Sequence, residues 1–237
     1  MNKINAQDRL IVALDLPSID DARRMVEQLD GVVRFYKVGL TLQLTAGRDF
    51  LDFVMKGGNK LFLDYKYFDV EETVRKAVLQ AAQLGVSFLT IHGNGRIIQA
   101  AVEGRGTSGM KLLAVTVLTS LDAHDIGELG FPCSVEHLVL HRAKKALEAG
   151  CDGVVASGHE AGRIREAAGG KLVIVTPGIR PEGYPGDEQK RKVTPKSSIS
   201  AGADYLVVGR PITHQPDPRA AATAILEEMQ AAFDAQV

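Results

Sequence analysis

The sequence has almost no excess of charge of either sign, and this balance excludes one class of protein, while its ordinary content of apolar residues excludes another. Among its 237 residues, 28 lysines and arginines stand against 29 aspartates and glutamates, which leaves a formal net charge of −1. A protein that binds nucleic acid through phosphate contacts carries an excess of basic residues, so this balance argues against such a partner. Hydrophobic residues make up 45% of the chain, which excludes intrinsic disorder.

Long apolar runs and cysteine pairs are also missing. One of the longest apolar runs covers residues 112–118 and is far too short to span a bilayer. The first ten residues, MNKINAQDRL, lack the apolar segment of a secretory signal. Cys133 and Cys151 lack the spacing of metal ligands and are expected to be free thiols. These features predict a cytoplasmic protein without a membrane segment.

Short apolar runs alternate along the chain with segments of helical spacing. The runs are continuously apolar, as in parallel strands that are buried on both faces. We expect strands at 10–14, 35–38, 60–63, 88–91, 112–117, 153–155, 172–175 and 205–208. This order predicts an α/β protein, a (β/α)₈ TIM barrel in which residues 1–237 form a single domain. A doubly wound open sheet is the competing architecture, but it would place a glycine-rich loop after the first strand, where this chain has DLPSIDD.

Several helix ends carry recognisable signals. Ser18 with Asp21, and Asp69 with Glu72, each predict a capping box at a helix start. A threonine followed by proline at 194–195 predicts a third start. Glycines at 85, 150 and 202 follow helical segments, where left-handed C-caps are common.

Catalytic groups of a barrel gather where its strands end. Asp64 and Lys66 lie two residues apart at the end of the third expected strand, so we expect both on one face, and Lys37 of the neighbouring strand can add a second cation. Alternating charges in a confined site keep one another ionised, and such a lysine can donate a proton. The structural alternative is a salt bridge, with Asp69 serving only as a helix cap.

The loops after the last two strands form the usual phosphate site of such barrels. They offer Arg180, Gln189, Gly209 and Arg210. Glycine lets the backbone approach an anion, and arginine can clamp a phosphate with two hydrogen bonds. The alternative is a tight turn with a surface arginine.

Taken together, these motifs resemble one enzyme family over nearly the whole chain. They are V-A-L-D ending at Asp15, Y-K-V-G around Lys37, D-Y-K-Y-F-D at 64–69, V-L-T-S at 117–120, T-P-G-I-R at 176–180 and V-V-G-R-P-I-T at 207–213. In this order the set resembles the orotidine 5′-phosphate decarboxylases.

The resemblance implies an activity and a set of residue roles. The activity is the decarboxylation of orotidine 5′-monophosphate to UMP, the last step of de novo pyrimidine synthesis, without a metal or an organic cofactor. For the chemical step the resemblance implies Lys66 as the proton donor to C6, Asp64 near the substrate carboxylate, and Asp69 completing the charged array from the partner of a homodimer. For the ribose it implies Asp15, Lys37 and the partner's Thr73. It implies Thr119 and Ser120 for the pyrimidine, and Arg180, Gln189, Gly209 and Arg210 for the phosphate.

The chain departs from the family pattern at two places. The usual Asp-Ile-Pro-Asn-Thr reads Asp-Val-Glu-Glu-Thr at 69–73, where two glutamates suit the first turn of a helix. The usual Gly-Asp-Gln reads Gly-Asp-Glu-Gln at 186–189, and counting back from Thr194 favours Gln189 as the phosphate ligand.

Two other functions fit part of the pattern. Sugar-phosphate decarboxylases and aldolases of the same superfamily, such as 3-keto-gulonate 6-phosphate decarboxylase and hexulose-phosphate synthase, share D-x-K-x-x-D and use its carboxylates to hold Mg²⁺ and an enediolate. The V-L-T-S and G-D-E-Q elements favour the nucleotide enzyme. A non-catalytic barrel that binds a phosphorylated ligand is the second alternative, but it gives no reason for paired charges at a strand end.

Overall fold

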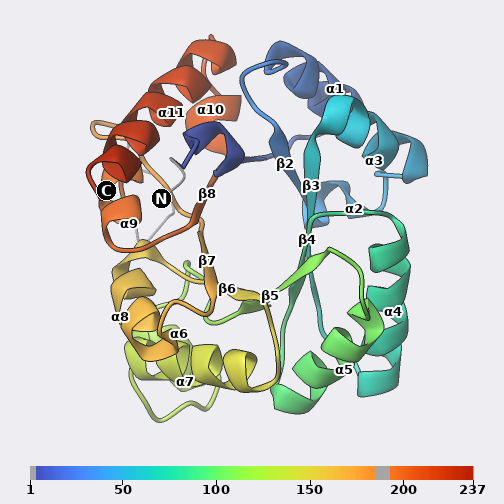
Figure 1. The fold of residues 1–237 in the computed structure, drawn as a ribbon, viewed down its shortest axis with the longest axis vertical. Helices are drawn as coiled ribbons and strands as arrows, with labels where there is room; N and C mark the ends of the chain where they lie inside the picture. Colours follow the sequence, from blue (N-terminus) through green and yellow to red (C-terminus); the bar gives the residue numbers. More distant parts are fainter. Residues whose placement is uncertain (1–3, 185–192, 237) are drawn as a thin grey trace.

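The chain folds into a closed barrel of eight parallel strands with helices around its outside (Figure 1). The structure is a computed structural model that describes residues 4–184 and 193–236. The strands follow one another around the barrel in chain order, and β1 pairs with β8 to close it. They are β1 (Leu10–Ala13), β2 (Phe35–Gly39), β3 (Lys60–Tyr67), β4 (Phe88–Ile91), β5 (Lys111–Val115), β6 (Gly153–Val155), β7 (Val173–Thr176) and β8 (Tyr205–Val208).

Helices follow the strands and confirm the predicted (β/α)₈ architecture. They are α1 (Ile19–Gln28), α2 (Leu40–Gln43), α3 (Arg48–Met55), α4 (Glu71–Gln83), α5 (Gly95–Arg105), α6 (Ala123–Glu128), α7 (Val135–Glu148), α8 (Gly158–Ala168), α9 (Pro195–Ser200), α10 (Arg210–Thr213) and α11 (Pro218–Asp234), with short 3₁₀ turns η1 (Ala6–Asp8) and η2 (Lys56–Gly58). Within the described residues, no helix is long and apolar enough to cross a membrane.

All eight predicted strands are present, and the largest difference lies in β3. This strand was expected to end at residue 63 but continues to Tyr67. Its pairing with β4 jumps from Leu63 opposite Leu89 to Tyr67 opposite Ile91. The polar residues between these pairs therefore belong to an irregular stretch of the sheet, which an apolar pattern does not reveal.

The inward-facing side chains of neighbouring strands form an aromatic layer inside the barrel and a polar layer at its mouth. Phe35, Phe62 and Phe88 point inward from neighbouring strands, and Phe88 meets the other two rings edge to face at centroid distances of 4.9 and 5.8 Å. Because side chains of a strand alternate between its two faces, the inward positions two residues further on are Lys37, Asp64 and Thr90. The aromatic layer thus supports a polar layer at the carboxyl ends of β2, β3 and β4.

The helix start predicted at Thr194 is confirmed, the one at Ser18 is confirmed as an N-cap, and the one at Asp69 is wrong. At Ser18 the predicted box is incomplete, because the Asp21 carboxylate accepts a hydrogen bond from the Ser18 hydroxyl group rather than from its amide. Ser18 caps α1 by accepting a hydrogen bond from the Asp21 amide, and the threonine at 194 caps α9 with proline at the next position. The predicted box at Asp69 is absent, because the N-cap of α4 is Val70 and no side chain caps it. Glu72 instead pairs with basic residues one turn further along the helix. The glycines at 85, 150 and 202 have positive φ, as predicted.

Candidate active site

A cavity of about 530 Å³ opens at the carboxyl ends of the strands. Most residues singled out from the sequence line it, namely Asp15, Lys37, Asp64, Lys66, Thr119, Ser120, Arg180, Gly209 and Arg210. They come from β2 and β3 and from the segments that follow β1, β5, β7 and β8. The barrel therefore brings together groups that lie almost 200 residues apart in the sequence.

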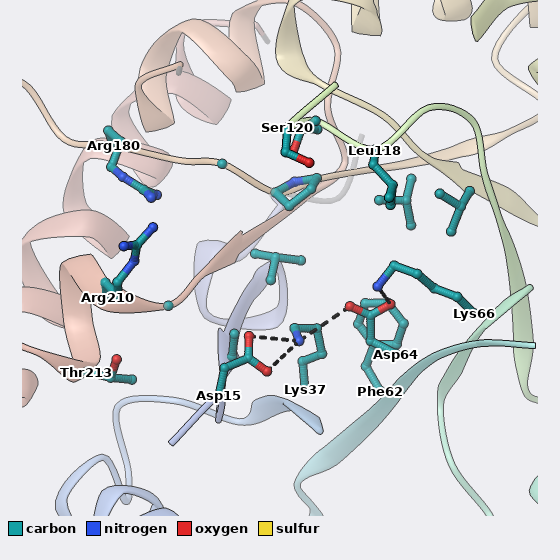
Figure 2. Close-up of a pocket in the computed structure, with 18 of the residues that line it drawn as sticks. Asp15, Lys37, Phe62, Asp64, Lys66, Leu118, Ser120, Arg180, Arg210 and Thr213 are labelled. Carbon is teal, nitrogen blue, oxygen red and sulfur yellow. Dashed lines mark hydrogen bonds and ion pairs between the residues drawn. The ribbon is translucent and has the colours of Figure 1, made fainter. Parts of the chain in front are cut away.

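Four charged side chains form a row of alternating sign along one side of the cavity (Figure 2). The Lys37 ammonium donates to Asp15 Oδ1 at 3.0 Å and lies 3.4 Å from Asp64 Oδ2. The Lys66 ammonium donates to the other oxygen, Asp64 Oδ1, at 2.9 Å. The Lys37 side chain is 7% exposed and that of Asp64 16%, so this part of the row is shielded from water.

Lys66 reaches Asp64 through a strained backbone rather than through simple strand alternation. Its φ is 48°, and it is the only residue other than glycine with a positive φ among those the structure describes. For a residue with a side chain this left-handed conformation costs about 1–2 kcal/mol. The strain falls within the irregular stretch of β3 and turns the ammonium back toward the carboxylate.

Gly39, the last residue of β2, leaves room for the charged row. A Cβ atom at this position would lie 2.8 Å from both Asp15 Oδ1 and Lys37 Nζ. Any larger residue would force one or both of these groups to move. The Y-K-V-G motif thus provides a lysine and, two residues later, the space that the lysine needs.

The charged neighbours of Asp64 control its ionisation. Burial alone would raise the pKa of this carboxyl group, but the lysines at 37 and 66 and the hydrogen bond from Thr90 outweigh burial and hold the pKa below its usual value of 3.8. Asp64 is therefore an anion at neutral pH and can repel another carboxylate.

The lowered pKa of Asp64 predicts how its contribution to folding depends on pH. A depressed carboxyl pKa stabilises the fold above the unfolded-state pKa, and this stability is lost as the pH falls through the folded-state pKa. At pH 7 we expect Asp64→Asn to lower the free energy of unfolding by about 3 kcal/mol, since it leaves Lys37 underpaired. Urea unfolding should show this difference shrinking below about pH 4, where the unfolded-state carboxyl becomes protonated. A difference that does not change with pH would contradict the lowered pKa.

The other side of the cavity carries two arginines. Arg180 follows β7, Arg210 opens α10 after β8, and Figure 2 shows their guanidinium groups close together and away from the charged row. Thr119 and Ser120 lie in the turn between β5 and α6, on the rim of the same cavity. The cavity thus has an arginine end suited to a dianion and a charged row at a distance from it.

Two residues predicted from the sequence are not brought into this cavity. Asp69 and Thr73 are exposed and absent from its lining. The Asp69 carboxylate accepts a hydrogen bond from the Val70 amide. Gln189 lies outside the described residues.

Two features of the site were not predicted from the sequence. Thr90 of β4 forms hydrogen bonds with both Asp64 and Lys66, and apolar side chains, including Phe62 and Val207, line part of the cavity. The signal for Thr90 was available, because this threonine lies two residues after inward-facing Phe88 in the run FLTI.

Comparisons with known proteins point to the same family over most of the chain. The family model that describes the orotidine 5′-phosphate decarboxylase / HUMPS family matches residues 8–225. An orotidine 5′-phosphate decarboxylase of Nitrobacter winogradskyi is 57% identical over 224 residues, which cover 94% of this chain and 93% of the relative. One of Methylococcus capsulatus is 48% identical over 234 residues, which cover 98% and 96% of the two chains. The crystal structure of orotidine 5′-phosphate decarboxylase from Lactobacillus acidophilus matches with a TM-score of 0.81 and 37% identity, over 93% of this chain and 98% of that one.

Proposed function

Because the chain belongs to the orotidine 5′-phosphate decarboxylase / HUMPS family, we propose that it is the carboxy-lyase that converts orotidine 5′-monophosphate to UMP and CO₂. The observation that carries the proposal is the row of Asp15, Lys37, Asp64 and Lys66 at the barrel mouth, with two arginines across the cavity. The reaction would complete de novo pyrimidine synthesis. The free thiols of Cys133 and Cys151 fit an enzyme of the reducing cytoplasm.

The charges in the row match the charges that the reaction creates. Loss of CO₂ leaves the bonding electron pair on C6, in the plane of the pyrimidine, where no π-system delocalises it. An ammonium group beside C6 stabilises this carbanion only as it develops, which lowers the barrier rather than the energy of the bound substrate. In our proposal the Lys66 ammonium then gives its proton to C6 to form UMP, and the resulting amine regains a proton from water.

Asp64 would act on the substrate before the bond breaks. Its anionic carboxylate lies beside Lys66, so a substrate carboxylate placed at C6 would be close to a like charge. This repulsion is relieved as neutral CO₂ departs. Asp15 and Lys37 would hold the ribose hydroxyls, and Thr119 and Ser120 would meet the pyrimidine.

The phosphate would bind at the arginine end, through Arg180, Arg210 and the Gly209 backbone, with Gln189 as a further ligand. Binding energy from a phosphate remote from the breaking bond can offset the cost of crowding two carboxylates together. This is the reason to expect that the phosphate affects kcat as well as binding.

We further propose a homodimer in which Asp69 and Thr73 complete the site of the partner. Both residues are exposed and lie outside the cavity of their own chain. The apolar neighbours of Asp69 in the chain are also exposed, Phe68 by 64% and Val70 by 68%, so an apolar patch flanks this aspartate. Such a patch is typical of a surface that another chain covers.

The family name also includes enzymes that act on sugar phosphates, and the geometry of the charged row argues against this alternative. Each oxygen of Asp64 already faces a lysine ammonium, which favours a carbanion stabilised by lysine over a carboxylate that binds Mg²⁺. The deciding experiment is the loss of absorbance of orotidine 5′-monophosphate with purified protein in the presence of EDTA. Sustained turnover supports the proposal. Activity only with Mg²⁺ and a sugar phosphate would support the sugar-phosphate enzymes, and UMP binding without turnover would indicate a binding protein.

Removing Arg210 tests the phosphate site. We expect Arg210→Ala to raise KM for the nucleotide and Kd for UMP by about 10–100-fold, because it removes charge-assisted hydrogen bonds to the phosphate, and to lower kcat as well. Steady-state kinetics and UMP titration measure these changes, with Arg24→Ala, at an exposed position of α1, as the control. The nucleoside orotidine should be a very poor substrate for the unaltered protein. Similar kcat/KM values for nucleoside and nucleotide would contradict a phosphate site here.

A further inference from the structure

The hydroxyl group of Thr90 links the two central members of the charged row. Thr90 is fully buried in β4, with no measurable exposed surface. Its hydroxyl donates to Asp64 Oδ1 at 2.9 Å and accepts a hydrogen bond from the Lys66 amide, also at 2.9 Å. Because Asp64 Oδ1 also accepts from the Lys66 ammonium, the three residues form a closed ring of hydrogen bonds.

The ring lies where the sheet is irregular. Residues 64–66 of β3 face Thr90 alone on β4, between the pairs Leu63–Leu89 and Tyr67–Ile91. A regular ladder would give the Lys66 amide a carbonyl partner from β4, and here the hydroxyl oxygen of Thr90 takes that place. The same amide belongs to the residue with φ of 48°. Thr90 therefore gives the amide of the strained residue a hydrogen-bond partner.

We propose that Thr90 is a positioning residue for the decarboxylation, whose hydroxyl holds the Asp64 carboxylate and the Lys66 backbone so that the Lys66 ammonium stays beside the reacting carbon. The inference rests on the proposed function. It requires a side chain that donates and accepts at once, which threonine and serine do and valine does not. Valine otherwise has the shape of threonine, so the hydroxyl can be tested apart from packing.

The experiment compares Thr90→Val and Thr90→Ser with a matched control, Thr176→Val. Thr176 is also fully buried, at the end of β7, and its hydroxyl has no hydrogen-bond partner among the described residues. For each variant we would measure kcat and KM for orotidine 5′-monophosphate, Kd for UMP and the thermal midpoint. We expect Thr90→Val to lower kcat by about 10–100-fold while Kd for UMP changes less than about threefold, because a small displacement of a catalytic group affects the chemical step most. Thr90→Ser should recover most of the loss, and Thr176→Val should leave kcat unchanged.

The pH profile separates positioning from a general loss of structure. The charged groups that face Asp64 are Lys37 from β2 and Lys66 from β3, with Asp15 of the β1 loop beyond Lys37. His92 after β4 also lies near Lys66, whose charge contributes to lowering the pKa of this histidine after burial and Arg142. All of these charged groups are retained in Thr90→Val, whereas the Asp64 carboxylate loses the Thr90 hydrogen bond, which favours its charged form. Its pKa should therefore rise, and the acid limb of kcat/KM should move to higher pH. Thr176→Val should not move that limb.

Each outcome decides between the proposals. Thr90→Val with a kcat close to that of the Thr176→Val control, or Thr90→Ser as impaired as Thr90→Val, would overturn the positioning role while the decarboxylase function stands. Unaltered protein that does not decarboxylate orotidine 5′-monophosphate would overturn the function and the role with it. If Thr90→Val does not fold, Thr90→Ala against Thr90→Ser replaces it, since these two differ only in the hydroxyl group. Equal kcat values in that pair would overturn the role.

Discussion

Replacing Lys66 by alanine is expected to lower kcat for orotidine 5′-monophosphate by at least about 10³-fold, because in the proposed mechanism this one side chain supplies both the charge that stabilises the carbanion and the proton that quenches it. The barrel should stay folded, since the Lys66 side chain is 31% exposed and lies at the mouth rather than in the apolar interior. Loss of absorbance of the substrate measures the rate. Circular dichroism and UMP titration show whether the fold and the binding site persist.

Two further variants make this result specific. Lys66→Arg should not restore activity, because a guanidinium is bulkier than an ammonium and far too weak an acid to give up its proton. Lys171→Ala removes an exposed lysine just before β7, at the opposite end of the barrel, and should leave kcat unchanged. A Lys66→Ala protein with a near-normal kcat would show that another group protonates C6.

The sequence was sufficient to predict the barrel and most of the cavity lining, for a simple physical reason. Parallel barrel strands are buried on both faces, so their sequences are short apolar runs. The carboxyl ends of these strands all lie at the same end of the barrel. Asp15 and Arg210 could therefore be assigned to the same cavity although they lie far apart in the chain. The only additional assumption was that the eight runs close into a barrel.

The features that the sequence did not predict depend on local irregularity. An apolar pattern ends β3 at residue 63 because Asp64 and Lys66 are polar, yet the strand continues through them with a shifted register. The positive φ of Lys66 has no signal in the sequence, since lysine rarely adopts it. The cap predicted at Asp69 was wrong because the helix begins one residue later, which leaves this aspartate exposed on the rim.

The exposed Asp69 leads to the prediction that tests the proposed dimer. If Asp69 crosses a two-fold interface, Lys66 and Asp69 of one chain serve different active sites, and each chain both gives and receives an aspartate. Homodimers of Lys66→Ala and of Asp69→Ala should each be severely impaired, because every site lacks one member of the array. The two inactive proteins should then complement each other when their subunits are exchanged, for instance by mild denaturation and refolding of a mixture.

The recovered activity has a definite expected size. In a mixed dimer the Asp69→Ala chain keeps its own Lys66 and receives Asp69 from the Lys66→Ala chain, which gives one complete site, while the other site lacks both residues. With equal amounts and random pairing, half of the dimers are mixed and half of their sites are complete, so activity should return to about a quarter of that of the unaltered protein. Differently tagged chains allow the mixed dimers to be purified and verified. Verified mixed dimers that are no more active than their parents would mean that Asp69 acts within its own chain, since only an aspartate supplied across the interface can rebuild a site from two defective subunits.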